Sequence, residues 1–542
     1  MVYTFFCIFA ENYDWMMTKR TLLFMAAGLL LATAAWGQRR VATLPEAYCS
    51  PVIAGFHPDP SVCRVGDDYY LVNSSFEYFP GVPIYHSRDL TNWEQIGNVL
   101  GRESQLPLKG STSWLGIYAP TIRYHEGTYY MITTNVGNGG NFMVTATDPR
   151  GPWSEPIWLE QQGIDPSLWF DEESGKCYMV SNPDNTITLC EIDPKTGRQL
   201  TESRPIWQGT GGRYPEGPHI YRKDGYYYLL ISEGGTELAH SLTIARSRKI
   251  EGPYVANPDN PLLTHCSMAG QGNQVQGTGH GDLVEAKDGS WWMVLLAYRN
   301  FGGSYHHLGR ETFLTPVEWK KGQWPVIKEE SGKRKVEGGK KRHVRSSFVE
   351  GLPASPEWIH VQNTDSTMFG IREGRLQLVC SRSSLTDNDR PTFVARRQEC
   401  ERMVAETHLS FEEGLPRDEA GLTVYQIHDG HADLCLSPSN DQTEVVAKVR
   451  LKGVEAVLGR ATIEGYEAWL RVSSDGERYT FEYATDGKTF RTVGSVECSL
   501  LSTEVVGGFT GVVVGMYATG ANTAGAYGKS FALFDYFDYV EN

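Results

Sequence analysis

The sequence predicts an all-β protein with two domains, a five-bladed β-propeller followed by a β-sandwich. Two observations support this fold class. A strand–turn–strand pattern recurs five times within residues 45–330, and alternating apolar and polar runs separated by turn residues follow it. No long segment shows the 3.6-residue apolar period of a helix, so few helices are expected.

The five copies share one plan: a turn of small residues, a short strand, a polar turn and a second strand rich in aromatic residues. In the first copy, Asp59-Pro60-Ser61-Val62 precedes the aromatic strand Asp68–Val72. The period is roughly 50 to 60 residues, which is the length of a propeller blade. A repeat places equivalent positions on one ring around the axis. The positions that open the copies are Asp59, Ala119, Asp165, Glu216 and His280.

Further strand signals follow the paired strands of several copies. They are Pro83–Trp93, Phe142–Pro149 and Leu242–Ser247. Together with the paired strands they give about four strands in each blade, as a propeller requires. Residues 45–330 are therefore predicted to form the propeller.

A polar segment separates the two domains. Residues 328–345 are basic and contain glycine but almost no apolar residue, which is typical of an exposed connection. We assign residues 331–345 to a basic linker. A nucleic-acid-binding patch is the alternative interpretation, and the acidic remainder of the chain argues against it.

The pattern changes in residues 346–542. Short alternating runs, each predicted as a strand, are separated by Gly, Asn and Asp turns. A chain of short antiparallel strands over this length predicts a β-sandwich. The turn Ala484–Lys488 is a clear hairpin signal. The runs are Arg375–Val379, Ala468–Val472, Tyr479–Tyr483 and Phe531–Phe537.

The N-terminal residues 1–37 are predicted to be an upstream extension and a signal peptide. Met17–Arg20 is a basic segment, Thr21–Ala34 is apolar, and Ala35-Trp36-Gly37 resembles a cleavage site. The apolar run is short for a membrane span, so no membrane insertion is expected. The mature protein is predicted to be exported, to the periplasm or outside the cell.

Composition limits the classes of partner. The formal net charge is −15, whereas nucleic acids and anionic membranes require a basic surface. A neutral sugar is compatible with this charge and with the 14 Trp and 28 Tyr residues, although core packing accounts for most of those. The ten cysteines are scattered without a CxxC pair, so no zinc site is predicted.

Three carboxylates and a histidine on one ring are costly unless the site does chemistry. Cleavage of a glycosidic bond needs an ionised carboxylate, which takes a proton from water, and a protonated carboxyl group, which gives a proton to the leaving oxygen. A third carboxylate near the acid helps it keep its proton. Asp59, Asp165 and Glu216 supply these three groups. The alternative is that Asp-Pro and Glu-Gly merely begin turns, which the common register of all three disfavours.

Several separated motifs resemble glycoside hydrolase family 43, in the same order along residues 48–330. The remainder resembles the concanavalin-like, or lectin-like, sandwich that follows the catalytic domain in the β-xylosidase and α-L-arabinofuranosidase branch. The motifs are Gly55-Phe56-His57-Pro58-Asp59-Pro60-Ser61, Ser75-Phe76-Glu77, Gly116-Ile117-Tyr118-Ala119-Pro120, Gly163-Ile164-Asp165-Pro166-Ser167, Pro215-Glu216-Gly217-Pro218-His219, Gly279-His280-Gly281-Asp282 and Leu308-Gly309-Arg310-Glu311-Thr312.

The resemblance implies a role for each matched residue. Asp59 would be the general base, Asp165 the residue that modulates the pKa of the acid, and Glu216 the general acid. The remaining matched residues would bind the sugar. Phe76 and Tyr118 would form an aromatic wall, although many xylosidases of this branch carry Trp at the second position. His280 and Arg310 would line the pocket; His280 could equally be a core histidine, orient the carboxylates or lie beside an ion.

The resemblance also implies the reaction and its requirements. The family inverts anomeric configuration, so the carboxyl groups of Asp59 and Glu216 should lie about 6.5–9.5 Å apart. An exo-acting enzyme is expected, one that removes terminal xylose or arabinofuranose from plant hemicellulose oligosaccharides (fragments of xylan, arabinoxylan or arabinan). No cofactor is required, and a single Ca²⁺ or Na⁺ ion near the propeller axis is compatible with the family.

Two other classes of protein fit part of the pattern. Retaining fructosidases share the five-bladed layout, but their Trp-Met-Asn-Asp-Pro-Asn and Arg-Asp-Pro phrases are absent here. A carbohydrate-binding propeller without catalysis would be expected to have lost a carboxylate, and all three are present. Turnover of an aryl glycoside separates the second class from an enzyme.

Overall fold

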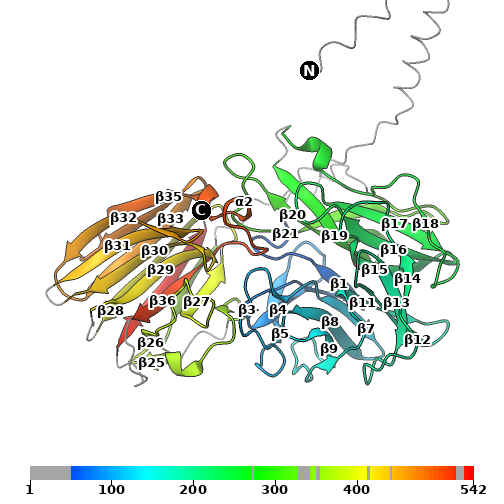
Figure 1. The fold of residues 1–542 in the computed structure, drawn as a ribbon, viewed down its shortest axis with the longest axis horizontal. Coiled ribbons are helices and arrows are strands. Elements are labelled where there is room, and N and C mark those ends of the chain that lie inside the picture. The colour runs from blue at the N-terminus through cyan, green and yellow to red at the C-terminus, as the bar shows by residue number, and fades with distance from the viewer. Residues whose placement is uncertain are drawn as a thin grey trace, which may run out of the picture. The chain divides into compact units, whose positions relative to one another are not determined.

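The computed structural model describes residues 51–270, 274–327, 342–349, 355–411, 416–439, 442–520 and 530–541 (Figure 1). The predicted extension and signal peptide, residues 1–37, and most of the predicted linker lie outside these ranges. Within them the chain is almost entirely β-structure. No helix in the described ranges is both long and apolar enough to cross a membrane.

Five antiparallel sheets follow one another along the first domain, consistent with the five predicted blades. The first sheet contains β1 (Ser61–Val65), β2 (Asp68–Val72), β4 (Gly81–Ser87) and β5 (Glu94–Leu100). The second contains β6 (Gly116–Ile117), β7 (Thr121–His125), β8 (Thr128–Val136), β9 (Gly140–Ala146) and β10 (Ile157–Trp158). The third contains β11 (Ile164–Asp171), β12 (Lys176–Asn182), β13 (Ile187–Ile192) and β14 (Arg204–Trp207). The fourth contains β15 (Glu216–Lys223), β16 (Tyr226–Glu233), β17 (Ser241–Ser247) and β18 (Val255–Ala256). The fifth contains β19 (Val275–Glu285), β20 (Trp291–Arg299), β21 (Glu311–Glu318) and β22 (Val326–Ile327).

The first strands of the repeats form a closed series. β1 contacts β7 and β19, β11 contacts β7 and β15, and β15 contacts β19. The segment before β1 joins the last sheet, because the Val52 N–H donates a hydrogen bond to the Thr312 carbonyl at 2.8 Å. The two strands predicted in each repeat are the paired strands of each sheet, for example β1 with β2 and β15 with β16. Equivalent positions of the repeats therefore do meet around one axis.

Two larger sheets form the second domain, in yellow to red in Figure 1. One contains β23 (His343–Ser347), β25 (Phe369–Arg372), β26 (Arg375–Val379), β28 (Arg402–Phe411), β33 (Glu467–Asp475), β34 (Arg478–Ala484), β35 (Arg491–Glu497), β37 (Phe531–Phe534) and β38 (Tyr536–Glu541). The other contains β27 (Thr392–Arg397), β29 (Asp418–Ile427), β30 (Gly430–Pro438), β31 (Thr443–Leu451), β32 (Val454–Ile463) and β36 (Val513–Gly520). The described helical turns are short: Cys266–Met268, Ser366–Met368, Cys498–Leu501 and α2 (Thr503–Val506).

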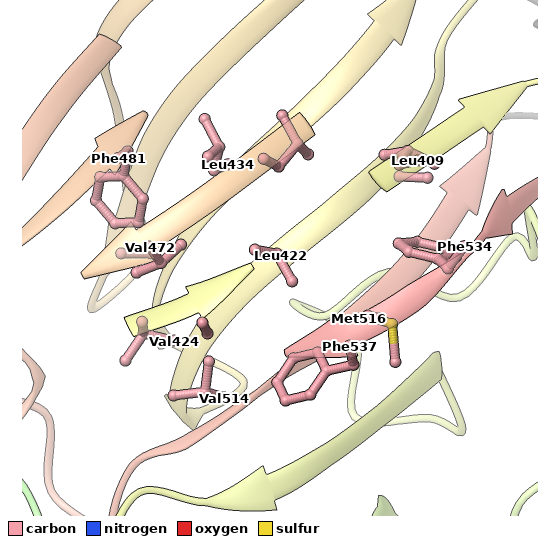
Figure 2. Packing of buried hydrophobic residues seen from close by; sticks show 14 of the residues in the cluster. Leu409, Leu422, Val424, Leu434, Val472, Phe481, Val514, Met516, Phe534 and Phe537 are labelled. Carbon is pink, nitrogen blue, oxygen red and sulfur yellow. The ribbon is translucent and has the colours of Figure 1, made fainter. Parts of the chain in front are cut away.

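The sandwich core lies between these two sheets. Every second residue of β28 is buried, which is the alternation of a strand with one face on a core. Figure 2 shows Leu409 of β28 and Phe534 of β37 packed with residues of the facing sheet, Leu422 and Met516 among them. All four side chains are completely buried. The predicted sandwich is therefore confirmed as a two-layer structure.

One predicted run differs from the structure. The alternating run Phe531–Phe537 is divided into β37 and β38 at Asp535. The Asp535 N–H donates to the His408 carbonyl at 3.0 Å, and its carboxylate lies 2.7 Å from His408 Nδ1. Because both backbone and side chain of Asp535 bond to His408, the strand is interrupted there, and both halves pair with β28.

The two domains are in direct contact. The short strand β3 (Tyr78–Phe79) of the first domain pairs with β24 (His360–Val361) of the second. Gly511 packs so closely on the first domain that a Cβ there would lie 2.2 Å from the Leu308 carbonyl oxygen. β23 spans the predicted boundary at residue 346 and pairs with β38.

Candidate active site

The three carboxylates lie where the first strands of their repeats begin, and His280 lies in the middle of β19 (Val275–Glu285). Asp59 precedes β1, Asp165 lies in β11, Glu216 begins β15 and His280 lies in β19. Asp59, Asp165 and His280 have φ angles of 52°, 53° and 46°, a conformation that costs energy for a residue with a side chain. The strand registers shift beside Asp165, Glu216 and His280. These bulges turn the side chains toward the axis.

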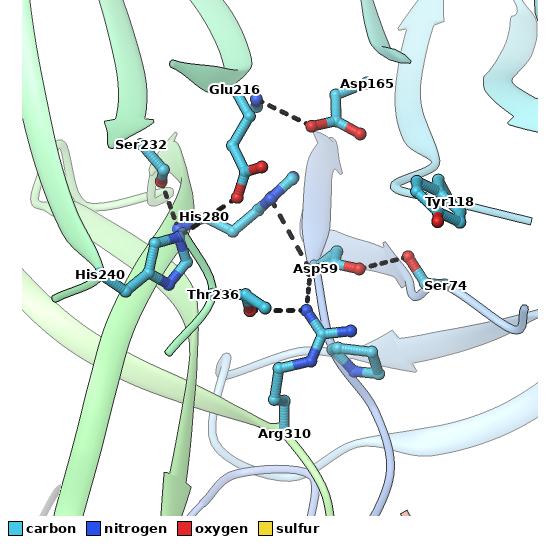
Figure 3. Close-up of polar contacts among 12 residues, drawn as sticks. Asp59, Ser74, Tyr118, Asp165, Glu216, Ser232, Thr236, His240, His280 and Arg310 are labelled. Carbon is cyan, nitrogen blue, oxygen red and sulfur yellow. Dashed lines mark hydrogen bonds and ion pairs between the residues drawn. The ribbon is translucent and has the colours of Figure 1, made fainter. Parts of the chain in front are cut away.

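Asp59 is held as a carboxylate. Ser74 Oγ donates to Asp59 Oδ2 at 2.5 Å, and Arg310 Nη1 donates to Oδ1 at 3.3 Å (Figure 3). Burial alone would raise the pKa of Asp59, but Arg310, His280 and the Ser74 hydroxyl outweigh it and lower that pKa below its ordinary value. A carboxylate that stays ionised is suited to accept a proton.

The surroundings of Asp165 favour its protonated form, in contrast to those of Asp59. Burial, and then the neighbouring carboxylates of Glu216 and Asp59, raise the pKa of Asp165 well above its ordinary value. The Gly217 N–H, next to Glu216, donates to Asp165 Oδ2 at 3.1 Å and ties the two carboxyl residues together. The raised pKa of Asp165 means that a proton is retained on this side of the pocket at a pH at which an isolated carboxyl group has lost its own.

Two histidines stand beside the carboxylates. His280 Nδ1 lies 3.7 Å from Asp59 Oδ1, and its backbone N–H donates to Ser232 Oγ at 2.5 Å. Burial lowers the pKa of His280 despite the nearby charges of Asp59 and Glu216. His240, which no sequence motif indicated, places Nε2 at 3.4 Å from Glu216 Oε1.

An aromatic wall lies beside Arg310. The ring centres of Phe76 and Tyr118 are 5.2 Å apart, and that of Phe509 is 5.7 Å from Phe76. The Arg310 guanidinium lies over both Phe76 and Phe509 and donates to the Phe509 carbonyl at 3.1 Å. The structure thus brings together all the sequence-predicted site residues, and it adds Phe509 from the second domain.

A cleft of about 770 Å³ adjoins this pocket. It shares Arg310 and Phe509 with the pocket, and residues of both domains line it, among them Trp114, Tyr298 and Glu504. Such a mixture of aromatic and polar groups suits a sugar or a chain of sugars.

Sequence reasoning missed Phe509, Trp114 and His240. Phe509 lies in the glycine-rich phrase Gly507-Gly508-Phe509-Thr510-Gly511, and an aromatic residue flanked by glycines was the only available signal. Trp114 is 46% exposed although it is a large aromatic residue, but its exposure is visible only in the structure.

A hydrogen-bonded group centred on Arg123 lies at the axis of the propeller. Arg123 Nη1 donates to Asp282 Oδ2 at 2.8 Å, and Nη2 lies 2.9 Å from His219 Nδ1. Ser61 and Ser167 complete this group, so each of the five sheets contributes one residue. A guanidinium already neutralises its only carboxylate, and no group of three metal-ligating side chains occurs in the described residues.

Comparison with known proteins assigns both domains. Residues 48–325 match the model of glycosyl hydrolases family 43, and residues 350–540 match the model of the beta xylosidase C-terminal concanavalin A-like domain. The second match confirms the predicted concanavalin-like character of the sandwich.

The relatives are similar over almost their whole length. A Bacteroides ovatus protein named non-reducing end alpha-L-arabinofuranosidase BoGH43B is 39% identical over 536 residues, which cover 95% of this chain and 98% of that protein. A Butyrivibrio fibrisolvens protein named xylosidase/arabinosidase is 37% identical over 519 residues, covering 91% of this chain and 99% of that protein. A solved structure described as Bacteroides ovatus Xyloglucan PUL GH43B has a TM-score of 0.84 at 39% identity, covering 90% of this chain and 99% of that one. On its sequence motifs, its fold and these matches, the chain belongs to the glycosyl hydrolases of family 43.

Proposed function

We propose that this protein is an inverting, exo-acting glycoside hydrolase. It removes terminal xylose or arabinofuranose from plant hemicellulose oligosaccharides such as fragments of xylan, arabinoxylan or arabinan. The observation that carries the proposal is the contrast between the carboxyl groups: the pKa of Asp59 is lowered, whereas that of Asp165, beside Glu216, is raised. A base and an acid set apart by their environments are what glycosidic hydrolysis needs.

In the proposed mechanism the Asp59 carboxylate takes a proton from a water molecule. The water oxygen forms a bond to the anomeric carbon while the bond from that carbon to the leaving oxygen breaks. The leaving oxygen receives the proton of Glu216, and Asp165 keeps that proton available by repelling negative charge on Glu216. Arg310 holds Asp59 ionised and in place.

The two candidate sugars are suggested by the names of the relatives rather than by the pocket. Proteins named for arabinofuranosidase and xylosidase activity are both close to this chain. The aromatic wall of Phe76, Tyr118 and Phe509 fits one sugar ring, and the cleft beyond Arg310 accepts the remainder of the substrate. A non-catalytic carbohydrate-binding propeller is not favoured, because the site contains all three carboxyl groups that the reaction needs.

The first experiment measures hydrolysis of 4-nitrophenyl β-D-xylopyranoside and 4-nitrophenyl α-L-arabinofuranoside. Turnover of one or both supports the proposal and names the sugar. Proton NMR of the first product formed from a natural oligosaccharide should show the inverted anomer. Turnover of neither aryl glycoside and of no oligosaccharide would favour a binding protein, and a retained anomer would exclude inversion.

Arg310→Gln is expected to move the acid limb of the pH profile of kcat/KM toward higher pH. Arg310 lowers the pKa of Asp59, so without its charge Asp59 is protonated, and thus inactive, at a higher pH. The measurement is kcat/KM against pH, and Arg310→Lys, which keeps the charge, is the matched control. An unmoved acid limb in Arg310→Gln would show that Asp59 is not the group that titrates there.

Phe509→Ala is expected to lower kcat/KM about 10- to 100-fold, mainly by raising KM, because it removes one aromatic face of the pocket. The control is Phe490→Ala in the same domain, whose ring stacks on Arg471. Wild-type kinetics in Phe509→Ala would show that the second domain does not complete the pocket.

We further propose that the reaction needs no cofactor, because the Arg123 guanidinium already neutralises Asp282, the carboxylate of the axial group. Treatment with EDTA, followed by added Ca²⁺ or Na⁺, is expected to leave kcat/KM unchanged and to shift Tm by less than about 1 °C. A loss of activity that Ca²⁺ or Na⁺ restores would contradict this.

Export to the periplasm or the outside of the cell is a proposal that rests on residues 17–37. It is tested by determining the N-terminus of the mature protein from the producing cells. A chain that begins near Gln38 supports cleavage, and a chain that retains Met16 or Met17 contradicts it.

A further inference from the structure

His240 is a buried histidine next to the general acid, at the turn that precedes β17. Its ring is completely buried. Its backbone is fixed at both ends, because its N–H donates to the Glu237 carbonyl at 3.0 Å and its carbonyl accepts from Thr264 Oγ1 at 3.0 Å. The backbone hydrogen bonds on both sides of His240 therefore fix the position of its buried ring.

The protonation of the ring follows from its partners. His240 Nδ1 lies 3.1 Å from the Gly277 carbonyl oxygen, which can only accept a hydrogen bond, so Nδ1 carries the hydrogen. Nε2 of the neutral ring then presents a lone pair. Nε2 makes no well-formed hydrogen bond with any described residue, and Glu216 Oε1 lies 3.4 Å from it.

The strand that carries His280 also makes room for His240. A Cβ on Gly279 would lie 2.2 to 2.4 Å from three atoms of the His240 ring, so only glycine allows the ring to lie there. Gly277, on the same strand, supplies the carbonyl that fixes the tautomer. β19 therefore sets His280 against Asp59 and His240 against Glu216 at the same time (Figure 3).

The other titratable or charged groups around Glu216 and His240 are Asp59, Asp165, His280 and Arg310. The two aspartates repel negative charge on Glu216, and Arg310 is engaged by Asp59. Only the protonated carboxyl group of Glu216 can donate to the bare Nε2 of His240. A contact that only the acid form can make favours the acid form.

We propose that His240 is a positioning residue for the general acid: its Nε2 accepts a hydrogen bond from protonated Glu216, so that the acid keeps its proton and its orientation until the leaving oxygen arrives. This inference rests on the proposed function. It adds a second neighbour of Glu216 to Asp165, and both neighbours favour the protonated form of Glu216.

The test compares His240→Asn with wild type. Asn places its amide nitrogen near the position of Nδ1, so the hydrogen bond to the Gly277 carbonyl can persist while Nε2 is lost. We expect kcat/KM on a natural disaccharide to fall about 10- to 100-fold. On a 2,4-dinitrophenyl glycoside, whose leaving group needs no acid, the change should be less than about 3-fold. The alkaline limb of the pH profile should move about one pH unit lower.

Two further variants separate this role from a structural one. His265→Asn changes another completely buried histidine, whose Nδ1 lies 2.9 Å from the Val275 carbonyl, and it should leave the alkaline limb in place. His240→Gln can present an amide oxygen to Glu216, and it should restore much of the lost activity. Should His240→Asn not fold, ¹⁵N-histidine NMR of the wild type, assigned with His240→Gln, is expected to show a non-protonated Nε2.

Several results would overturn the proposal. Equal losses on both substrates, an unmoved alkaline limb, a limb moved to higher pH or a protonated Nε2 at the pH optimum would each do so. A limb at higher pH would mean that His240 is a cation that donates to a Glu216 carboxylate. Failure of the proposed function would look different, because wild type itself would then hydrolyse no glycoside.

Discussion

Asp59→Asn is expected to lower kcat/KM about 10⁴-fold on every substrate, aryl glycosides included. An amide cannot take a proton from water, and the attack of water is needed whatever the leaving group is. Asn is nearly isosteric with Asp and can still accept the hydrogen bond of Ser74 Oγ, so the pocket should keep its shape. The measurement is kcat/KM on an aryl glycoside and on an oligosaccharide, with the Tm of each protein.

The matched control is Asp67→Asn. Asp67 belongs to the same repeat, but its side chain is 63% exposed and forms a surface ion pair with Lys287. Its loss should leave kinetics and stability nearly unchanged. An Asp59→Asn variant that keeps activity within tenfold of wild type, on a pure preparation, would transfer the role of base to another group.

The positions of the carboxylates could be predicted from the sequence because the repeat itself carries them. Asp59, Asp165 and Glu216 open equivalent copies, and equivalent copies of a closed ring of sheets meet at the axis. The strands that follow them, such as β2 and β16, are indicated by their runs of tyrosine. The local sequence pattern and the overall fold agree here, so the arrangement of the carboxylates could be predicted from the pattern.

The remaining parts of the site could not be predicted, for physical reasons that differ between residues. Phe509 reaches the pocket from a loop of the second domain, and no short-range pattern reports a contact with Phe76, which lies hundreds of residues earlier. His240 depends on the missing side chain of Gly279, which the sequence shows only as one of its 57 glycines. Arg123 looks like an ordinary strand residue until its partner Asp282 is placed beside it.

The position of Arg310 explains why the carboxyl groups on the two sides of the pocket differ in charge. Arg310 contacts Asp59, so one carboxylate is neutralised and stays ionised. Near Glu216 no described arginine or lysine makes an ion pair, and the neighbours are Asp165 and His240. The asymmetry of base and acid thus follows from a single guanidinium on one side of the pocket.

Glu216→Ala is expected to lower kcat/KM on natural oligosaccharides by about 10³- to 10⁴-fold, because the leaving alkoxide then departs without a proton. On 2,4-dinitrophenyl glycosides, whose leaving phenolate is stable, the loss should be less than about tenfold. A plot of log kcat/KM against the pKa of the leaving phenol should therefore be steep for the variant and shallow for wild type. The alkaline limb of the pH profile should also disappear, because the group that loses its proton there has been removed.

The leaving-group series separates a lost acid from a damaged pocket. Misplaced sugar binding would lower the rate on all leaving groups alike, whereas a missing proton matters only where the leaving oxygen is basic. Glu155→Ala is the matched control, since its side chain is 60% exposed and forms a surface ion pair with Arg102. Equal losses for good and poor leaving groups in Glu216→Ala would show that Glu216 shapes the pocket and that the proton comes from elsewhere, with Asp165, whose pKa is raised, as the next candidate.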